Sequence, residues 1–143
     1  MKTFRFWAGC LVAVFCMSML AACDDDEEVS DSEIGAVEIV GLWEAVYDEG
    51  WEIYNGEREE WDGPLGEDER IMISLDADGY FAIWAKGNEN ARNEGRYELD
   101  GKLLTFYYIG MEIVANVSFP DENTMVMEHS ESDYFDRITF ERR

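Results

Sequence analysis

Cysteine is scarce in this sequence and absent from most of it. The chain has three cysteines, Cys10, Cys16 and Cys23, and none follows them. A domain formed by the rest of the chain therefore has no disulfide framework, and its stability depends on a hydrophobic core. The stretch from Cys23 to Arg143 is long enough to bury such a core in one domain.

Basic residues are also few. Lysine and arginine number 11 against 33 aspartates and glutamates, and the formal net charge is −22 at pH 7. Nucleic-acid binding needs a basic stripe that neutralises phosphates, and this chain has none. The same excess of acid disfavours contact between the protein surface and an anionic bilayer. It favours a positively charged partner, whose attraction weakens with salt.

Residue patterns that carry out catalysis are missing. His129 is the only histidine, and no reactive thiol or Gly-x-Ser-x-Gly elbow accompanies it. We expect His129 to lie on the surface of a strand. Residues 76–79 (Asp-Ala-Asp-Gly) lack the spacing of a calcium loop, so we interpret them as a turn. We therefore expect no enzyme activity, no metal site and no cofactor.

The N-terminus carries an export signal that ends at a cysteine. Lys2 and Arg5 are basic, and the uncharged, largely apolar segment from Phe6 to Met19 follows them. This order is that of a bacterial signal peptide. The next residues, Leu20-Ala21-Ala22-Cys23, resemble the lipobox of bacterial lipoproteins. The resemblance implies removal of residues 1–22 and attachment of acyl chains such as palmitate to Cys23.

Two other interpretations of this segment stay open. It could be a plain secretory signal with a chance cysteine, or an uncleaved membrane helix. The apolar run is shorter than the roughly 20 residues that a membrane span needs, which favours the lipoprotein. Because more than one acyl chain makes anchoring stable, the folded domain then needs no membrane-inserting surface.

An acidic segment follows the cysteine. Residues 24–28 are five consecutive acids, and residues 23–38 show few apolar positions and no sustained period, which predicts a flexible tether. The acidic run resembles the surface-export signal of lipoproteins in some Gram-negative bacteria. An aspartate directly after the cysteine resembles the inner-membrane retention signal of others. We favour the outer membrane, with exposure at the cell surface.

From Ile39 onward the sequence predicts β-strands throughout. Asn55-Gly56 and Asp100-Gly101 each separate two runs of strand-forming residues, a strong signal for two-residue hairpin turns. A turn at Asp100-Gly101 places Leu99 opposite Lys102. No segment shows a helical period. The predicted fold over residues 39–143 is all-β, an antiparallel up-and-down meander of about 8–10 strands that closes into a barrel and so removes its edges.

Alternation along these strands predicts which side chains form the core. In the hairpin around Asp100, Tyr97, Leu99, Leu104 and Phe106 share one face, and charged residues occupy the other. The same alternation places further side chains inside: Ile71, Ile73, Leu75, Phe81, Ile83, Ile113, Ala115, Val117, Phe119, Met125, Met127, Ile138 and Phe140.

The start of the first strand carries a family resemblance. Gly41-Leu42-Trp43 matches the Gly-x-Trp signature of the lipocalins, and the segment from about Val40 to Arg143 is similar to lipocalin-like domains of small Gram-negative lipoproteins. The resemblance implies an arginine of the last strand packed over the tryptophan. Arg142 is the first candidate because its parity matches that of the core residues, and Arg137 is the second. It also implies a tendency to hold small apolar molecules, although the domain is shorter than a typical lipocalin.

The segment from Asp48 to Glu69 combines acids with aromatic residues. It holds ten acids and one base, Arg58, together with Trp51, Tyr54 and Trp61. One interpretation is that the tryptophans cover a barrel end while the acids are solvated. The other is a binding rim, since exposed aromatic rings beside carboxylates suit cations, cationic peptides or sugars.

These features lead us to expect a lipid-anchored, monomeric, non-catalytic binding module of the cell envelope. Its ligand would be small and hydrophobic or amphipathic, and apolar or cationic. Two alternatives stay open. One is a protein-interaction or inhibitor module that binds a basic partner through residues 48–69, and the other is a structural accessory lipoprotein.

We predict that a Cys23→Ser variant carries no lipid, because serine cannot form the thioether. A Cys16→Ser variant should be lipidated normally, since Cys16 lies in the segment that is removed. Metabolic labelling with a fatty-acid analogue measures both. Equal labelling of Cys23→Ser and the natural protein would contradict the lipobox assignment.

Overall fold

In a computed structural model of the protein, the described residues are 38–143. The signal peptide expected at residues 1–22, the acylation site Cys23 and the tether up to residue 37 lie outside the described residues. No helix within residues 38–143 is long and apolar enough to cross a membrane.

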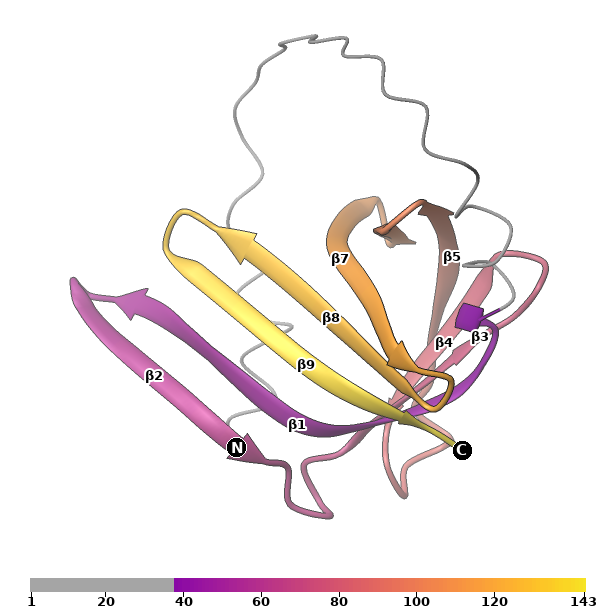
Figure 1. Cartoon of the computed structure of the whole chain (residues 1–143), viewed down its shortest axis with the longest axis horizontal. Coiled ribbons are helices and arrows are strands. Elements are labelled where there is room, and N and C mark those ends of the chain that lie inside the picture. Colours follow the sequence, from indigo (N-terminus) through magenta and orange to yellow (C-terminus); the bar gives the residue numbers. More distant parts are fainter. Residues whose placement is uncertain (1–37) are drawn as a thin grey trace, which may run out of the picture. The chain divides into compact units, whose positions relative to one another are not determined.

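Nine antiparallel strands form a single sheet (Figure 1). Their order is β2-β1-β3-β4-β5-β6-β7-β8-β9, and β1 also pairs with β9, so eight strands close into a barrel and β2 is an extra strand. This confirms the all-β, up-and-down, lipocalin-like barrel. The strands are β1 (Gly41–Tyr54), β2 (Glu57–Pro64), β3 (Ile71–Leu75), β4 (Tyr80–Ala85), β5 (Asn93–Asp100), β6 (Leu103–Tyr108), β7 (Met111–Asp121), β8 (Thr124–Glu131) and β9 (Tyr134–Arg142).

Strand β1 is long enough to pair with three other strands. Residues 41–44 pair with β3, residues 47–54 pair with β2 on the same edge, and β9 pairs along the opposite edge. The β1–β2 and β8–β9 hairpins therefore lie side by side and extend together at one end of the barrel (Figure 1). The β1–β2 turn is Asn55-Gly56, with positive φ at both residues, as the sequence predicts.

The predicted turn at Asp100-Gly101 is wrong by one position. Asp100 pairs with Leu103, so the turn residues are Gly101 and Lys102. Of these only Gly101 has a positive φ, 60°, which matches a turn that needs glycine at its first central position. Leu99 therefore faces Leu104 instead of Lys102. The register changes by two residues, so each side chain keeps its predicted face.

One end of the barrel is sealed around Trp43, which is fully buried. The Trp43 Nε1–H donates to the carbonyl of Ile39 at 2.8 Å, and the Arg142 guanidinium lies 4.2 Å from the centroid of the Trp43 ring. Arg142 Nη1 also donates to the carbonyl of Val40 at 2.8 Å and touches the position of Gly41. Residues 39–41 thus close this end. Arg137, the second candidate for the contact with Trp43, instead pairs with Glu49 and Glu128.

A buried carboxylate stabilises the outer face near this closed end. Glu44 is 3% exposed and accepts hydrogen bonds from Arg70 and Lys86, each at 2.8 Å, and from Arg143. Burial alone would raise the pKa of Glu44, but the bonds from Lys86, Arg70 and Arg143 outweigh it and hold the pKa at about 2. One carboxylate therefore joins two loops to the C-terminus and occupies three of the few cations.

We predict that Trp43→Ala lowers the free energy of unfolding by about 3–5 kcal/mol, because it empties a large buried site and removes the surface under Arg142. Tyr54→Ala, at an exposed turn position, should change it by less than about 0.5 kcal/mol. Urea titration of the two purified variants measures both. A loss below about 1 kcal/mol for Trp43→Ala would contradict a sealing role.

Candidate functional site

Exposure of the inward-facing side chains increases from one end of the barrel to the other. Next to Trp43, the inward residues Leu75 and Ile73 of β3 are buried, but Ile71 is half-buried. On β8, Met125 is buried, Met127 is half-buried and Glu131 is exposed. The interior is therefore filled at the closed end and open to solvent at the other, which we call the mouth.

Half of the mouth is apolar. Its half-buried, inward-facing residues come from β3, β4, β6 and β7, and Tyr108 is held by a hydrogen bond from its hydroxyl to Asn93 Oδ1 at 2.7 Å. The pairing of Met111 with Tyr108 and of Ile113 with Phe106 places them on the core face. We call this group the apolar wall: Ile71, Ile83, Tyr108, Met111 and Ile113.

The other half of the mouth is polar and acidic, and we call it the acidic corner: Asp48, Trp61, His129, Tyr134 and Asp136. Asp136 pairs with Gly50 on one side and with His129 on the other, so these positions share the inward face. Trp61 also lies opposite Gly50, where an added Cβ would meet the indole at 2.7 Å. The absence of a side chain at Gly50 therefore lets the indole cross β1.

Aromatic rings cover the acidic corner. The Trp61 Nε1–H donates to Asp48 Oδ1 at 2.9 Å. The Trp61 and Tyr134 ring centroids are 6.1 Å apart, and those of Tyr134 and His129 are also 6.1 Å apart. These contacts explain why Asp136 is only 1% exposed although it lies in the open half of the barrel.

Asp136 is the least satisfied group of this cluster. Neither of its carboxyl oxygens has a hydrogen-bond partner of good geometry. The pKa of Asp136 is raised from 3.8 to about 8, chiefly by burial and next by the nearby carboxyl of Asp48, while Tyr134 and His129 act in the opposite direction. Ionising Asp136 in this buried position beside another carboxyl is costly, so Asp136 retains its proton near neutral pH.

The expectation that His129 lies on a strand surface is wrong. Its side chain is 13% exposed and faces inward, with Nδ1 2.7 Å from the carbonyl oxygen of Val114 and Nε2 3.3 Å from Glu131 Oε1. The sequence contained the signal for this placement, because His129 has the parity of Met125 and Met127. In the same way Asp136 has the parity of Ile138 and Phe140, which marks it as a carboxyl in a core position.

The structure does not bring the three aromatic residues of the predicted rim together. Trp51 pairs with Glu60 and Trp61 with Gly50, so the two indoles lie on opposite faces of the β1–β2 hairpin. The Arg58 guanidinium covers Trp51 at 4.5 Å from the ring centroid. Tyr54, 59% exposed, lies near the turn. Only Trp61 contributes to the mouth.

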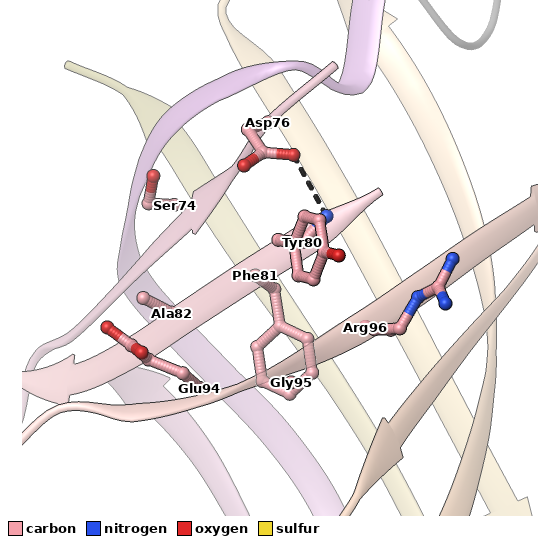
Figure 2. Close-up of a pocket in the computed structure, with 8 residues that line it drawn as sticks. All are labelled: Ser74, Asp76, Tyr80, Phe81, Ala82, Glu94, Gly95 and Arg96. Carbon is pink, nitrogen blue, oxygen red and sulfur yellow. Dashed lines mark hydrogen bonds between the residues drawn. The ribbon is translucent and has the colours of Figure 1, made fainter. Parts of the chain in front are cut away.

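A separate depression lies where β3, β4 and β5 run side by side (Figure 2). It encloses about 460 Å³ and is lined by Ser74, Asp76, Tyr80, Phe81, Ala82, Glu94, Gly95 and Arg96. Asp76 is engaged in its own turn, since its Oδ1 accepts the N–H of Tyr80 at 2.9 Å. The Arg96 guanidinium lies 5.6 Å from the exposed Tyr80 ring. No buried polar group without a partner lines this depression, so the mouth is the stronger candidate site.

No protein-family model matches the sequence, and no curated protein matches it. Within residues 38–143 no group of three or more histidine, cysteine, aspartate or glutamate side chains is arranged to hold a metal ion.

We predict that Asp136→Asn stabilises the protein at high pH. Because the folded state holds the Asp136 proton up to about pH 8 and the unfolded chain releases it near 3.8, the natural protein loses stability as pH rises through this range. The variant has no such proton. Its free energy of unfolding should exceed that of the natural protein by about 1–3 kcal/mol at pH 8 and by nearly nothing at pH 4.

Urea titrations at both pH values measure this difference. Asp100→Asn, which removes an exposed carboxylate at the closed end, serves as the control and should change stability little at either pH. A variant of Asp136 that is less stable than the natural protein at pH 8 would show that the carboxylate is satisfied in its ionised form.

Proposed function

We propose that this protein is a lipid-anchored, non-catalytic binding module of the bacterial cell envelope, which takes a small hydrophobic or amphipathic ligand into the mouth of its barrel. The observation that carries the proposal is the exposure gradient along the inward strand faces. The closed end is filled by the protein's own side chains, whereas the mouth leaves inward-facing apolar side chains half-buried.

The composition of the mouth supports a binding role. Small-molecule sites are concave and mostly apolar, with a few polar groups that orient the ligand, and barrel mouths are common places for them. The apolar wall supplies the apolar lining. The polar groups that could orient a ligand are Asp48, His129, Tyr134 and Asp136. The resemblance of Gly41-Leu42-Trp43 to the lipocalin signature agrees with this function.

The anchor follows from the lipobox resemblance. Acylation of Cys23 would hold the domain at the outer membrane, with residues 24–37 as a spacer, and the strongly acidic surface would keep the barrel itself off an anionic bilayer. In this arrangement the acyl chains, and not the barrel surface, would hold the protein at the membrane, which leaves the mouth available to ligands.

The alternative of a protein-interaction module receives less support. That hypothesis needs Trp51, Tyr54 and Trp61 on one acidic rim, and Trp51 and Trp61 lie on opposite faces of the hairpin. Trp51 is also occupied by Arg58. A structural accessory protein would not need an open mouth, so this alternative is also less favoured.

We predict that the neutral fluorescent probe N-phenyl-1-naphthylamine binds the domain saturably. Ile113→Gln, which places an amide in the apolar wall, should weaken binding at least about fivefold, since removing one apolar contact from such a site costs about 1 kcal/mol or more. Val114→Gln makes the same change at the next residue, on the outer face, and should change binding less than about twofold. Fluorescence titration measures all three proteins.

Two outcomes would contradict the proposal. One is the absence of saturable probe binding by the natural protein. The other is an equal effect of Ile113→Gln and Val114→Gln, which would mean that the probe binds the outer surface.

A further inference from the structure

We infer that the mouth selects amphipathic cations: the ammonium group of the ligand pairs with the carboxyls of Asp136 and Asp48, and its apolar part lies on the apolar wall. This inference rests on the proposed function and specifies the chemical class of the ligand. Three observations carry it, and each concerns a different property of the acidic corner.

The first observation is the unpartnered state of Asp136. Its side chain faces inward and is 1% exposed, and neither oxygen has a hydrogen-bond partner of good geometry, although Asp48 and Tyr134 lie near enough to affect its pKa. A buried polar group without a partner costs free energy, and an ionised carboxylate costs more. A ligand that donates to Asp136 from the mouth removes this cost, so the site contributes most of its affinity when the ligand carries a donor with positive charge.

The second observation is that the protein places no lysine or arginine in the acidic corner, where His129 is the one side chain able to carry a positive charge. The described residues include every lysine and arginine except Lys2 and Arg5. Their contacts lie on the outer face or at the closed end: Arg70, Lys86 and Arg143 on Glu44, Arg137 on Glu49 and Glu128, Arg58 on Trp51, Arg92 on Trp84, Arg96 on Tyr80, Arg142 on Trp43, with Lys102 in the β5–β6 turn. The acidic, inward-facing pair therefore has no lysine or arginine as counter-ion within the described barrel.

The third observation is the aromatic cover. Trp61, Tyr134 and His129 form a continuous set of rings over Asp48 and Asp136, with neighbouring centroids 6.1 Å apart. Ring faces of tryptophan and tyrosine attract ammonium groups, and this attraction strengthens where water is excluded. The same rings repel an anionic headgroup, as do the carboxylates of Glu52 and Glu131, which flank the pair on the inward face of β1 and β8.

The charge balance of binding follows from the proton held by Asp136. An incoming ammonium stabilises the ionised form of Asp136, so this proton leaves to solvent as the ion pair forms. The titratable groups that face Asp136 are Asp48 and Glu52 of β1, His129 and Glu131 of β8, and Tyr134 of β9. Affinity for the cation should therefore increase as pH rises from 6 to 8, while affinity for a neutral ligand should not.

The test compares three probes that share one chain length and differ in headgroup: decylamine, decanol and decanoate. Each is titrated, below its micelle concentration and at constant ionic strength, against the complex of the domain with N-phenyl-1-naphthylamine. For the natural protein at pH 7 we expect decylamine to bind about tenfold or more tighter than decanol, and decanoate to bind weakest.

Asp136→Asn separates the headgroup site from the apolar wall. The variant should still bind decanol through the apolar wall but lose the preference for decylamine over decanol and the dependence of that preference on pH. Asp100→Asn makes the same substitution at an exposed position of the closed end and should keep both within about twofold. The urea titrations described above verify that Asp136→Asn is folded.

The outcomes distinguish the inference from the proposed function. If neither the fluorescent probe nor decanol binds, the proposed function is wrong. If decanol binds but decylamine binds no tighter, or if Asp136→Asn retains the preference for decylamine, only the selection of cations is wrong. Tighter binding of decanoate would also overturn the inference, because it would require a cation in the mouth.

Discussion

The barrel depends on the pairing of β1 with β9. This pairing runs from Trp43 opposite Arg142 to Glu52 opposite Tyr134, and it joins the two ends of the meander. Closure satisfies backbone groups that two edge strands would otherwise expose. It also brings Arg142 over Trp43 at one end and Asp136 beside Gly50 at the other. One strand pairing thus creates both the closed end and the acidic corner of the mouth.

Two buried acids show how position in this barrel decides the state of a carboxyl. Glu44 lies on the outer face among Arg70, Lys86 and Arg143, which outweigh its burial and keep it ionised. Asp136 lies on the inner face beside another acid and without a lysine or arginine partner, and burial keeps its proton on although His129 lies opposite. The ion pairs of Glu44 stabilise the outer face. Asp136 has no lysine or arginine partner, and we infer that a cationic ligand takes this place.

The extra strand has a function in this arrangement beyond extending the sheet. Because β1 continues past its pairing with β3, the β1–β2 hairpin extends at the mouth, and β2 brings Trp61 across Gly50. The indole holds Asp48 and contacts Tyr134, so it limits access of water to Asp136. A shorter β1 would expose the acidic corner, and its carboxyls would behave as ordinary solvated acids.

Much of the fold could be predicted from the sequence because it depends on local alternation. A period of two in hydrophobicity, interrupted by turn residues, predicted an all-β meander and the apolar inward faces of β3 to β9. The turn predicted at Asp100-Gly101 is wrong, but the predicted faces of its two strands are correct, because a register shift of two residues preserves parity. The lipocalin resemblance implied an arginine over Trp43, and parity selected Arg142, which makes this contact.

Only the tertiary structure decided which side chains of β1 and β2 face the mouth. Trp51 has the parity of Trp43 and would face inward in a regular strand. A register shift between Ala45 and Tyr47 inserts Val46 and reverses the faces, so that Asp48 and Gly50 point inward and Trp51 points out. No local pattern marks such a bulge. By itself the sequence determined the strand class and the core faces, whereas closure and one inserted residue determined where the acids meet.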